Sequence, residues 1–304
     1  MGLRGPTDEL TPTLEIALRL NRCLANLYLR RPGAALRDCL ILKSKAAASK
    51  TFALTLPQRQ KIAARKLQAA YDLQLWNTVQ DALSQCKALN VEQKQWSKYQ
   101  STLTNRLIEA KGIYDWVGYV LRAFGSPMGA DPLHCLAEYR GPIQVRDMGS
   151  YGRGLFVTRD VKAGDIVLVE RHIHRSMYSH GAQVHLFEAT KGQQDMRAGT
   201  SSPGSTVVSF IADPSRVQAL AALAPHPTRL TPFLSEVERL DVIKGPLPSF
   251  NTDHVVRQEK ANAFGNVEEG SKTLGGSSMM NHSCLSNAGS IEFKDVSRRW
   301  ILKV

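Results

Sequence analysis

The sequence predicts an α+β chain, in which an N-terminal helical part precedes a mostly β part that carries a helical insertion. Three observations predict this class. Apolar residues recur at helical spacing between residues 13 and 111. Short strand-like runs punctuated by glycines follow from residue 139. Helical spacing then returns inside residues 171–262, before two further strand-like runs. With 304 residues the chain has room for about two domains.

Two predicted hairpins of helices make up most of the helical part. The first pairs residues 14–28 with residues 34–40, because Arg31-Pro32-Gly33 interrupts an otherwise helical pattern. The second pairs residues 62–73 with residues 79–86 across a short turn. Each hairpin has one apolar face and therefore needs a neighbour to cover it.

The two hairpins repeat each other about 44 residues apart, with Leu29 aligned on Leu73 and Ala35 on Val79. Their small-residue positions and leucine-x-x-aromatic turn resemble tetratricopeptide repeats, whose period is about 34 residues. The polar stretch 43–50 is then an insertion. The resemblance implies stacked helix pairs that could bind a peptide. An ordinary helical bundle without a peptide-binding groove is the alternative.

A third helix is expected from residue 91 to about residue 111, where alternating charged and polar residues would cap the array. Gly112-Ile113-Tyr114-Asp115-Trp116 closes this helix, and a connector that contains Gly and Pro runs to Glu138. The predicted organisation is a helical domain over 13–111, a connector over 112–138 and a mostly β domain over 139–304.

Two groups of strands are predicted in the β domain. The first comprises residues 139–146, 155–157 and 166–169, the last two as a pair around a hairpin turn at Lys162-Ala163-Gly164-Asp165. The second is a strand pair at residues 290–293 and 299–304.

An insertion separates the two groups of strands, at about residues 171–262. Residues 172–205 are polar and lack a helical or strand period, so we expect them to be mobile. A helix is predicted to begin at Pro214-Ser215 and to run to about residue 223. A further helix is predicted over residues 252–262.

Two motifs in the β part could carry chemistry. In the first, Gly152 and Gly154 flank Arg153 at a strand start, where the missing Cβ atoms would let a ligand lie against backbone amides. In the second, about 130 residues later, Asn281 and His282 offer an amide and an imidazole. A tight turn and a structural histidine explain either motif taken alone.

Taken together and in this order, the motifs resemble the SET domain of protein lysine methyltransferases. The first, Tyr151 to Glu170, is similar to the opening GxGLF segment of that family, and the second, Asn281 to Asn287, is similar to its NHSCxPN motif. The insertion and the helical repeats resemble those of its tetratricopeptide and MYND subgroup. The resemblance implies a protein lysine N-methyltransferase that uses S-adenosylmethionine and acts on a lysine side chain of a protein substrate.

The same resemblance implies where the cofactor would bind. The strand start would hold its methionine end, the later loop its adenosine half, and an Asn-x-Phe match at residues 262–264 its amino-acid end. The implied cofactor-binding residues are Gly152, Arg153, Gly154, Asn262, Asn281 and His282.

The second motif and the cysteines give no metal site. Ser286 stands where the family has a proline, which we expect only to loosen the loop. Cys284 joins a zinc site in MYND-containing relatives, but the chain has no Cys-x-x-Cys pair to complete four ligands, so we expect a buried thiol. The histidines between residues 172 and 185 are not spaced for one helical face. The five cysteines are expected to be reduced.

The last residues depart most from the family. After the strands at 290–293 and 299–304, the sequence stops at Val304, before the segment that supplies the catalytic tyrosine in the family. We therefore assign no catalytic residue and expect weak or absent methyl transfer from this form of the chain. A non-catalytic protein-binding scaffold with a degenerate SET domain is the alternative.

Composition restricts the partners and the location. The net charge of +12 and pI near 9.6 favour acidic partners. Nucleic acid is not expected, because the basic residues are spread along the chain and aromatic residues make up only 7% of it. No window reaches the roughly 18 apolar residues of a membrane span, and no signal peptide is visible. We therefore expect an intracellular chain, nuclear or cytoplasmic, without membrane contact.

Overall fold

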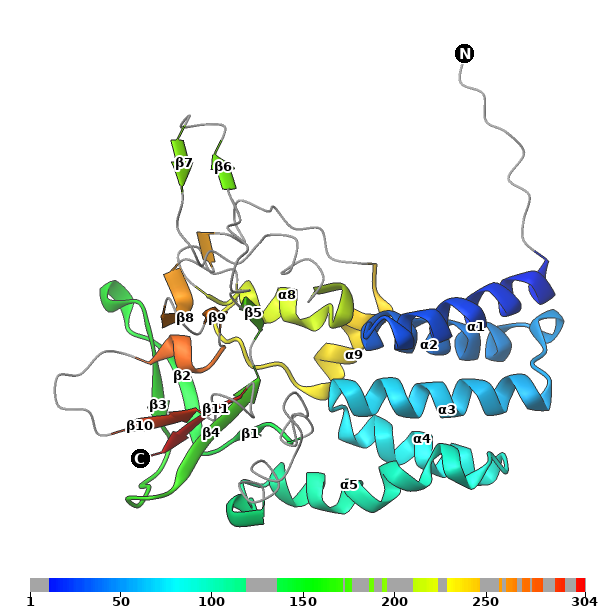
Figure 1. Cartoon of the computed structure of the whole chain (residues 1–304), viewed down its shortest axis with the longest axis horizontal. Helices are drawn as coiled ribbons and strands as arrows, with labels where there is room; N and C mark the ends of the chain where they lie inside the picture. The colour runs from blue at the N-terminus through cyan, green and yellow to red at the C-terminus, as the bar shows by residue number, and fades with distance from the viewer. Residues whose placement is uncertain are drawn as a thin grey trace. The chain divides into compact units, whose positions relative to one another are not determined.

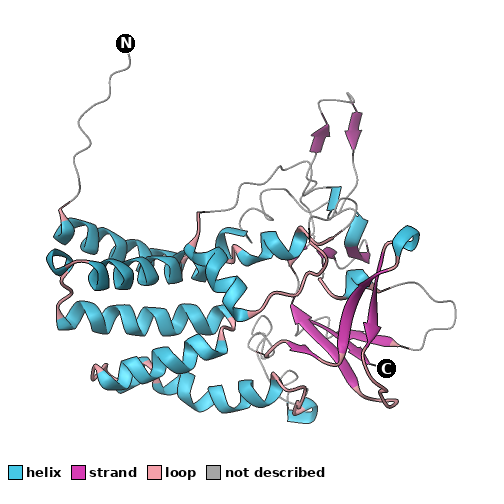
Figure 2. Cartoon of the chain, turned by 180° about the vertical axis from the view of Figure 1, so that it is seen from behind, coloured by secondary structure: helices cyan, strands magenta, loops and turns pink. Residues whose placement is uncertain are grey.

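The computed structural model describes residues 11–118, 136–171, 173–176, 186–188, 193–195, 210–223, 229–246, 257–258, 261–266, 270–273, 275–280, 288–292 and 299–303. The chain divides into two compact units, one of residues 1–103 with 243–246, and one of residues 104–242 with 247–304. Helices and small antiparallel sheets make up an α+β chain (Figure 1, Figure 2). The domain limits drawn from the sequence remain predictions.

Antiparallel helix pairs build the first unit. Its elements are α1 (Pro12–Tyr28), α2 (Pro32–Ala48), the 3₁₀ turn η1 (Lys50–Phe52), α3 (Leu56–Leu73), α4 (Trp76–Ala88), the 3₁₀ turn η2 (Gln93–Gln95) and the start of α5 (Ser97–Glu109). α1 packs on α2, α2 on α3, and α3 on α4 (Figure 1). The two predicted hairpins are confirmed, whereas the third predicted helix is shorter than expected, because η2 and Trp96 precede α5.

Local signals explain where these helices begin and end. The Thr11 hydroxyl accepts a hydrogen bond from the backbone N–H of Leu14, 3.4 Å away, at the start of α1. At the start of α3, the side chain of Gln58 accepts from the backbone N–H of Thr55 at 2.9 Å. Gln74 ends α3 in the left-handed conformation, with φ 59°.

Leucines and cysteines form the core of the helical unit. Its fully buried leucines are Leu36, Leu42, Leu67, Leu73 and Leu75. The thiols of Cys23 and Cys39 lie 3.5 Å apart in a hydrogen bond and form no disulfide, and Cys86 is buried too. Burial raises the pKa of Cys86 to about 11, so this thiol stays protonated at neutral pH. The prediction of reduced, buried thiols is confirmed for these three, whereas Cys135 and Cys284 lie outside the described residues.

Among the residues that the structure describes, the second unit forms four small antiparallel sheets. The largest has the order β1 (Tyr139–Arg140), β4 (Ile166–Arg171), β11 (Arg299–Lys303), β10 (Gly289–Glu292). The others are β2 (Ile143–Asp147) with β3 (Arg153–Val157), β5 (His174–Ser176) with β9 (Gly270–Thr273) and β8 (Ala263–Asn266), and β6 (Leu186–Glu188) with β7 (Gln193–Asp195). The helices α8 (Ser215–Leu220) and α9 (Glu236–Lys244), and the turns η3 (Gly149–Tyr151) and η4 (Ser277–Met279), complete the described elements.

The strand pairing differs from the prediction at one place. We expected a hairpin of residues 155–157 and 166–169, but β3 pairs with β2, and β4 pairs with β1 and β11. The turn itself forms, with the Asp165 N–H donating to the Lys162 carbonyl at 2.9 Å. This turn joins two sheets rather than two paired strands. The side chains of Val167, Leu168 and Val169 in β4 are all buried, and such a strand is suited to an interior position in the larger sheet.

The first predicted strand, residues 139–146, is two strands in the structure. β1 and β2 are separated by Gly141 and Pro142, because proline has no N–H to give to a ladder of hydrogen bonds. The final strand pair is confirmed as β10 and β11, with Ser290 opposite Leu302. The helix predicted from Pro214 is confirmed as α8, but α9 was not predicted.

Two predictions fall mainly on residues that the structure leaves undescribed. Within residues 172–205, the short strands β5, β6 and β7 are present and the remainder lies outside the described residues, so the expected mobility of this segment stays a prediction. Of the helix predicted over 252–262, only residues 257–258 and 261–262 are described, and they are helical. No helix among the described residues has the length and apolar character that crossing a membrane requires.

Candidate functional site

The first motif exposes its backbone where β3 begins. Gly152 has φ +77°, a conformation that glycine adopts most readily, and it closes the η3 turn by donating to the Gly149 carbonyl at 3.0 Å. A Cβ atom added to Gly152 would meet no atom within 4 Å. The space beside this residue is therefore open to a ligand.

Arg153 has a different role from its neighbours. Its guanidinium donates from Nη1 to the carbonyls of Arg229 and Leu230, each 2.8 Å away. Partial burial lowers the pKa of Arg153 from its ordinary value, but the side chain remains a cation at neutral pH. Its side chain therefore holds residues 229–230 against the start of β3, and only its backbone is left for a ligand at Gly152.

A buried carboxylate joins the end of the first motif to the approach to the second. Glu170, the last residue of the first motif, is only 7% exposed. It accepts hydrogen bonds from the backbone N–H groups of Gly276 and Ser277, each at 2.8 Å, and from the Ser277 hydroxyl at 2.5 Å. Burial raises the pKa of Glu170, although these three hydrogen bonds oppose the shift. We call these contacts the Glu170 clasp.

Apolar contacts support the same juxtaposition. Leu155 of β3 packs against the buried cluster that contains Met279, at the end of η4. Leu155, Met280 and Ala288 all pack against a second cluster, formed by Ile143, Val167 and Leu168. Because Met280 and Ala288 flank residues 281–287, both ends of the second motif lie against the strands of the first. Asn281 and His282 themselves lie outside the described residues.

Asn262 is also attached to the approach to the second motif. The side chain is 9% exposed, and its amide nitrogen donates to the Gln258 carbonyl at 2.7 Å. Its backbone carbonyl accepts from the Ser278 hydroxyl at 3.1 Å. Asn262 thus lies one hydrogen bond from η4, at the start of β8. Of the six predicted residues, Gly152, Arg153, Gly154 and Asn262 are described. β3, which begins at Arg153, contacts η4, and Asn262 is hydrogen-bonded to Ser278 of η4.

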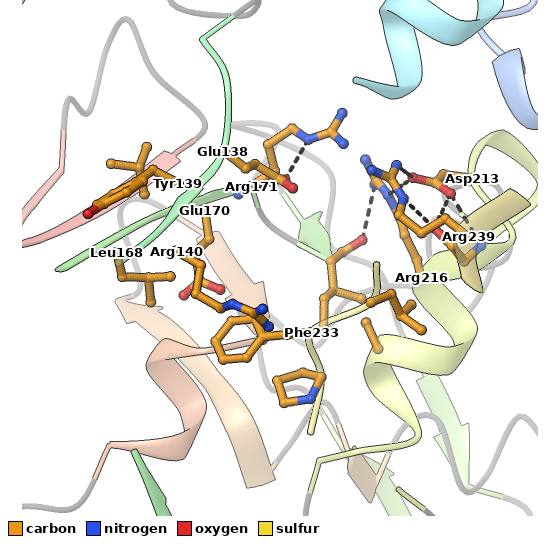
Figure 3. A pocket seen from close by; sticks show the side chains of 17 residues that line it. Glu138, Tyr139, Arg140, Leu168, Glu170, Arg171, Asp213, Arg216, Phe233 and Arg239 are labelled. Atoms are coloured by element: carbon orange, nitrogen blue, oxygen red, sulfur yellow. Dashed lines mark hydrogen bonds and ion pairs between the residues drawn. The ribbon is translucent and has the colours of Figure 1, made fainter. Parts of the chain in front are cut away.

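A cavity that the sequence did not indicate lies beside the Glu170 clasp. It has a volume of about 320 Å³ and is lined from β1, β4, α8, α9, residues 232–234 and Gly275 (Figure 3). Its charged lining residues are Glu138, Arg140, Glu170, Arg171, Asp213, Arg216 and Arg239. They are scattered between residues 138 and 239 without a spacing pattern, so only the fold assembles them.

Most of these charges are paired inside the cavity wall. Arg171 contacts Glu138 at 2.7 Å, and Arg239 contacts Asp213 at 3.1 Å (Figure 3). Burial opposes ionisation of Asp213, but the positive charges of Arg239, Arg216 and Arg171 outweigh it and lower the pKa of this carboxyl. The Arg140 guanidinium lies 5.1 Å from the centre of the Phe233 ring, in a cation–π contact. The paired charges favour a structural role for this wall.

The described residues include no group of three or more His, Cys, Asp and Glu side chains placed to hold a metal ion. The side chains of His172, His174, His180 and His185 lie outside what the structure describes.

Comparison with known proteins gives one distant relative. The chain is 28% identical over 153 residues to a protein of Gibberella zeae described as a methyltransferase, an alignment that covers 50% of this chain and 19% of the relative. The chain thus aligns with about a fifth of that protein's length. No protein-family model matches the chain, and no solved structure matches it.

Proposed function

We propose that residues 139–304 form the cofactor-binding core of a SET-type protein lysine N-methyltransferase, and that residues 13–111 form tetratricopeptide-like repeats. The observation that carries the proposal is the Glu170 clasp, which ties the end of the first motif to a segment 106 residues later that leads into the second. The similarity to a methyltransferase of Gibberella zeae supports the reaction class.

The cofactor in this proposal is S-adenosylmethionine. The backbone from Gly152 to Gly154 would hold its methionine end, Asn262 its amino group and carboxylate, and Asn281 with His282 its adenosine half. The open space at Gly152 fits a ligand lying against the strand start. When bound, the cofactor supplies a methyl group on a sulfonium, which an amine of a protein lysine can accept.

The chain's own contribution is to position the ligand and to exclude water. Leu155 of β3 packs against the cluster of Ile143, Val167 and Leu168, so β3 rests on an apolar layer that keeps water away from this side of the strand. The Glu170 clasp fixes the approach to Asn281 without using an exposed side chain. Positioning and exclusion of water are the main requirements for transfer of a methyl group between two bound partners.

Calorimetric titration of the whole chain with S-adenosylmethionine tests this proposal. We expect saturable binding of one cofactor per chain, with competition by S-adenosylhomocysteine. Absence of binding at cofactor concentrations up to about 1 mM, which corresponds to about −4.1 kcal/mol, would contradict the proposal. Incubation with radiolabelled cofactor and a mixture of lysine-rich proteins then tests methyl transfer separately from binding.

The alternative function is that of a protein-binding scaffold, in which the helical unit does the binding. The observation that favours it is a pair of hollows in that unit. The residues that line these hollows include several lysines and arginines and no aspartate or glutamate. Pull-down of the chain with and without S-adenosylmethionine separates the two functions, because a scaffold should bind its partner equally in both conditions.

A further inference from the structure

The long connection between α2 and α3 encloses a hollow in the helical unit. Only two or three residues join α1 to α2 and α3 to α4, but residues 49–55 with η1 join α2 to α3. The hollow has a volume of about 740 Å³, within the range of about 300–1,000 Å³ of ligand pockets. It is lined from the end of α2, this connection, the start of α3 and the end of α4. We call it the α2–α4 hollow.

The floor of the α2–α4 hollow is apolar and made largely of small side chains. Leu54, Ile62 and Ala63 are buried and line it. The alanines of the wall are Ala46, Ala47, Ala53 and Ala88. Because an alanine ends at Cβ, these walls leave room for the larger apolar side chain of a partner.

The charged lining residues of the hollow are all cations: Lys43, Lys50 and Arg59. Lys43 donates to the Gln85 side chain at 3.1 Å, and Arg59 Nε donates to the Leu54 carbonyl at 3.1 Å. Both are therefore oriented by uncharged oxygens. Burial, followed by the neighbouring charge of Lys66, lowers the pKa of Lys43, although the carboxylate of Asp81 opposes the shift.

Three other cations of the same unit already have a carboxylate. Arg22 contacts Asp38, Lys45 contacts Glu15 at 2.7 Å, and Lys66 contacts Asp81 at 2.5 Å. The three cations of the hollow differ from these because no acidic residue of the described chain forms an ion pair with them. An apolar floor with a cationic rim suits a ligand that has apolar and anionic groups close together.

We propose that the α2–α4 hollow binds an acidic peptide segment of a partner protein, with one or two apolar side chains inserted over Leu54 and Ile62 and carboxylates at Lys50 and Arg59. A peptide fits better than nucleic acid because the residues that line the hollow include no aromatic side chain on which a base could stack. This inference does not depend on the proposed methyl transfer.

Fluorescence anisotropy with a labelled peptide, acetyl-Gly-Glu-Leu-Asp-Glu-Leu-Asp-Gly-amide, tests the proposal on the full chain. We expect the double variant Lys50→Glu, Arg59→Glu to bind at least about tenfold more weakly than the unchanged chain. Ala47→Trp, which fills the exposed wall without changing charge, should weaken binding as well. Replacing both leucines of the peptide by serine should also weaken binding about tenfold, because the apolar floor then has no partner.

Lys61→Glu is the matched control, because Lys61 is an exposed cation of the same helix as Arg59 but lines a different hollow, between α1, α3 and α5. It should change the affinity less than about twofold. Circular dichroism melts check that each variant is folded. Loss of binding in Lys61→Glu would place the peptide in the other hollow and overturn the proposal. Equal binding of the leucine and serine peptides, with full competition by heparin, would show general attraction of polyanions and overturn it too.

Discussion

At the scale of single residues, the Glu170 carboxylate has the largest effect on how the two motifs meet. It is buried and receives three hydrogen bonds from Gly276 and Ser277, so removal of its negative oxygen atoms leaves buried donors without an acceptor. An unsatisfied buried donor costs about 1–3 kcal/mol. The clasp therefore contributes to stability and also sets the path of the chain toward residue 281.

We predict that Glu170→Gln lowers the free energy of unfolding by about 2–4 kcal/mol, because the new amide NH₂ group faces donors. Ser277→Ala removes only one of the donors and should lower it by about 1 kcal/mol. Urea denaturation of both variants checks these values. A loss below about 0.5 kcal/mol in Glu170→Gln would mean that the clasp does not hold the two segments together.

Gly152 and Gly149 offer a matched pair for testing ligand contact. Both have positive φ, and an added Cβ would meet no atom within 4 Å at either position. Replacement by alanine should strain the backbone at both positions, and more at Gly152, because its ψ of −135° lies outside the left-handed helical region that other residues tolerate. Gly152→Ala should weaken binding of S-adenosylmethionine about tenfold, whereas Gly149→Ala should leave it nearly unchanged. Equal affinities in a calorimetric titration would exclude a contact at Gly152.

At the scale of elements, α9 depends on a reciprocal cap at its first turn. The Ser235 N–H donates to the Glu238 carboxylate at 2.8 Å, and the Glu238 N–H donates to the Ser235 hydroxyl at 3.2 Å. The Ser235 backbone, then Arg229 and the Ser235 hydroxyl, lower the pKa of Glu238 to about 2. Since this pKa is below the ordinary value of 4.5 for a glutamate, the cap stabilises the fold above about pH 4.5 and is lost as the pH falls toward 2.

Glu238→Gln should therefore flatten the decline of stability between pH 4.5 and pH 2. The effect should be small, because the carboxylate is exposed to solvent. Glu236→Gln removes a charge from the same turn without removing these hydrogen bonds, and serves as the control. Urea midpoints measured at several pH values check the prediction, and equal slopes for Glu238→Gln and the unchanged chain would contradict it.

Helices were easier to predict than strand partners, for a physical reason. The pattern from Leu14 to Cys86 reports local contacts within each helix and its hairpin, so the two hairpins could be predicted. The partner of β3 depends on which strand meets it in space, and the pattern of β3 itself does not indicate β2 over β4. α9 was missed because its apolar residues show no clear helical spacing, so the capping residues Ser235 and Glu238 did not mark a helix start.

The candidate site shows the same division between local and distant information. The strand start at Gly152 and its open backbone follow from the local glycine pattern. The Glu170 clasp could not be predicted, because no feature of Glu170 alone indicates Ser277 as its partner. The arginine-lined cavity was missed for the same reason, since its charges come from four separate segments.

At the scale of the whole molecule, the proposed methyl-transfer site and the α2–α4 hollow belong to different compact units. Their effects should therefore be separable. A cofactor present at about 100 times its dissociation constant should stabilise the unit that binds it by about 2.7 kcal/mol. The peptide-site variants should leave that stabilisation unchanged, which thermal melts with and without S-adenosylmethionine would establish.

The central claim is that two segments about 130 residues apart form one cofactor site. Hydrogen–deuterium exchange of the whole chain, measured with and without saturating S-adenosylmethionine, tests this claim most directly. The account predicts slower exchange, when the cofactor is present, in peptides that cover both residues 150–157 and residues 276–288. Protection of only one of these segments, or of neither while the cofactor binds elsewhere, would contradict it.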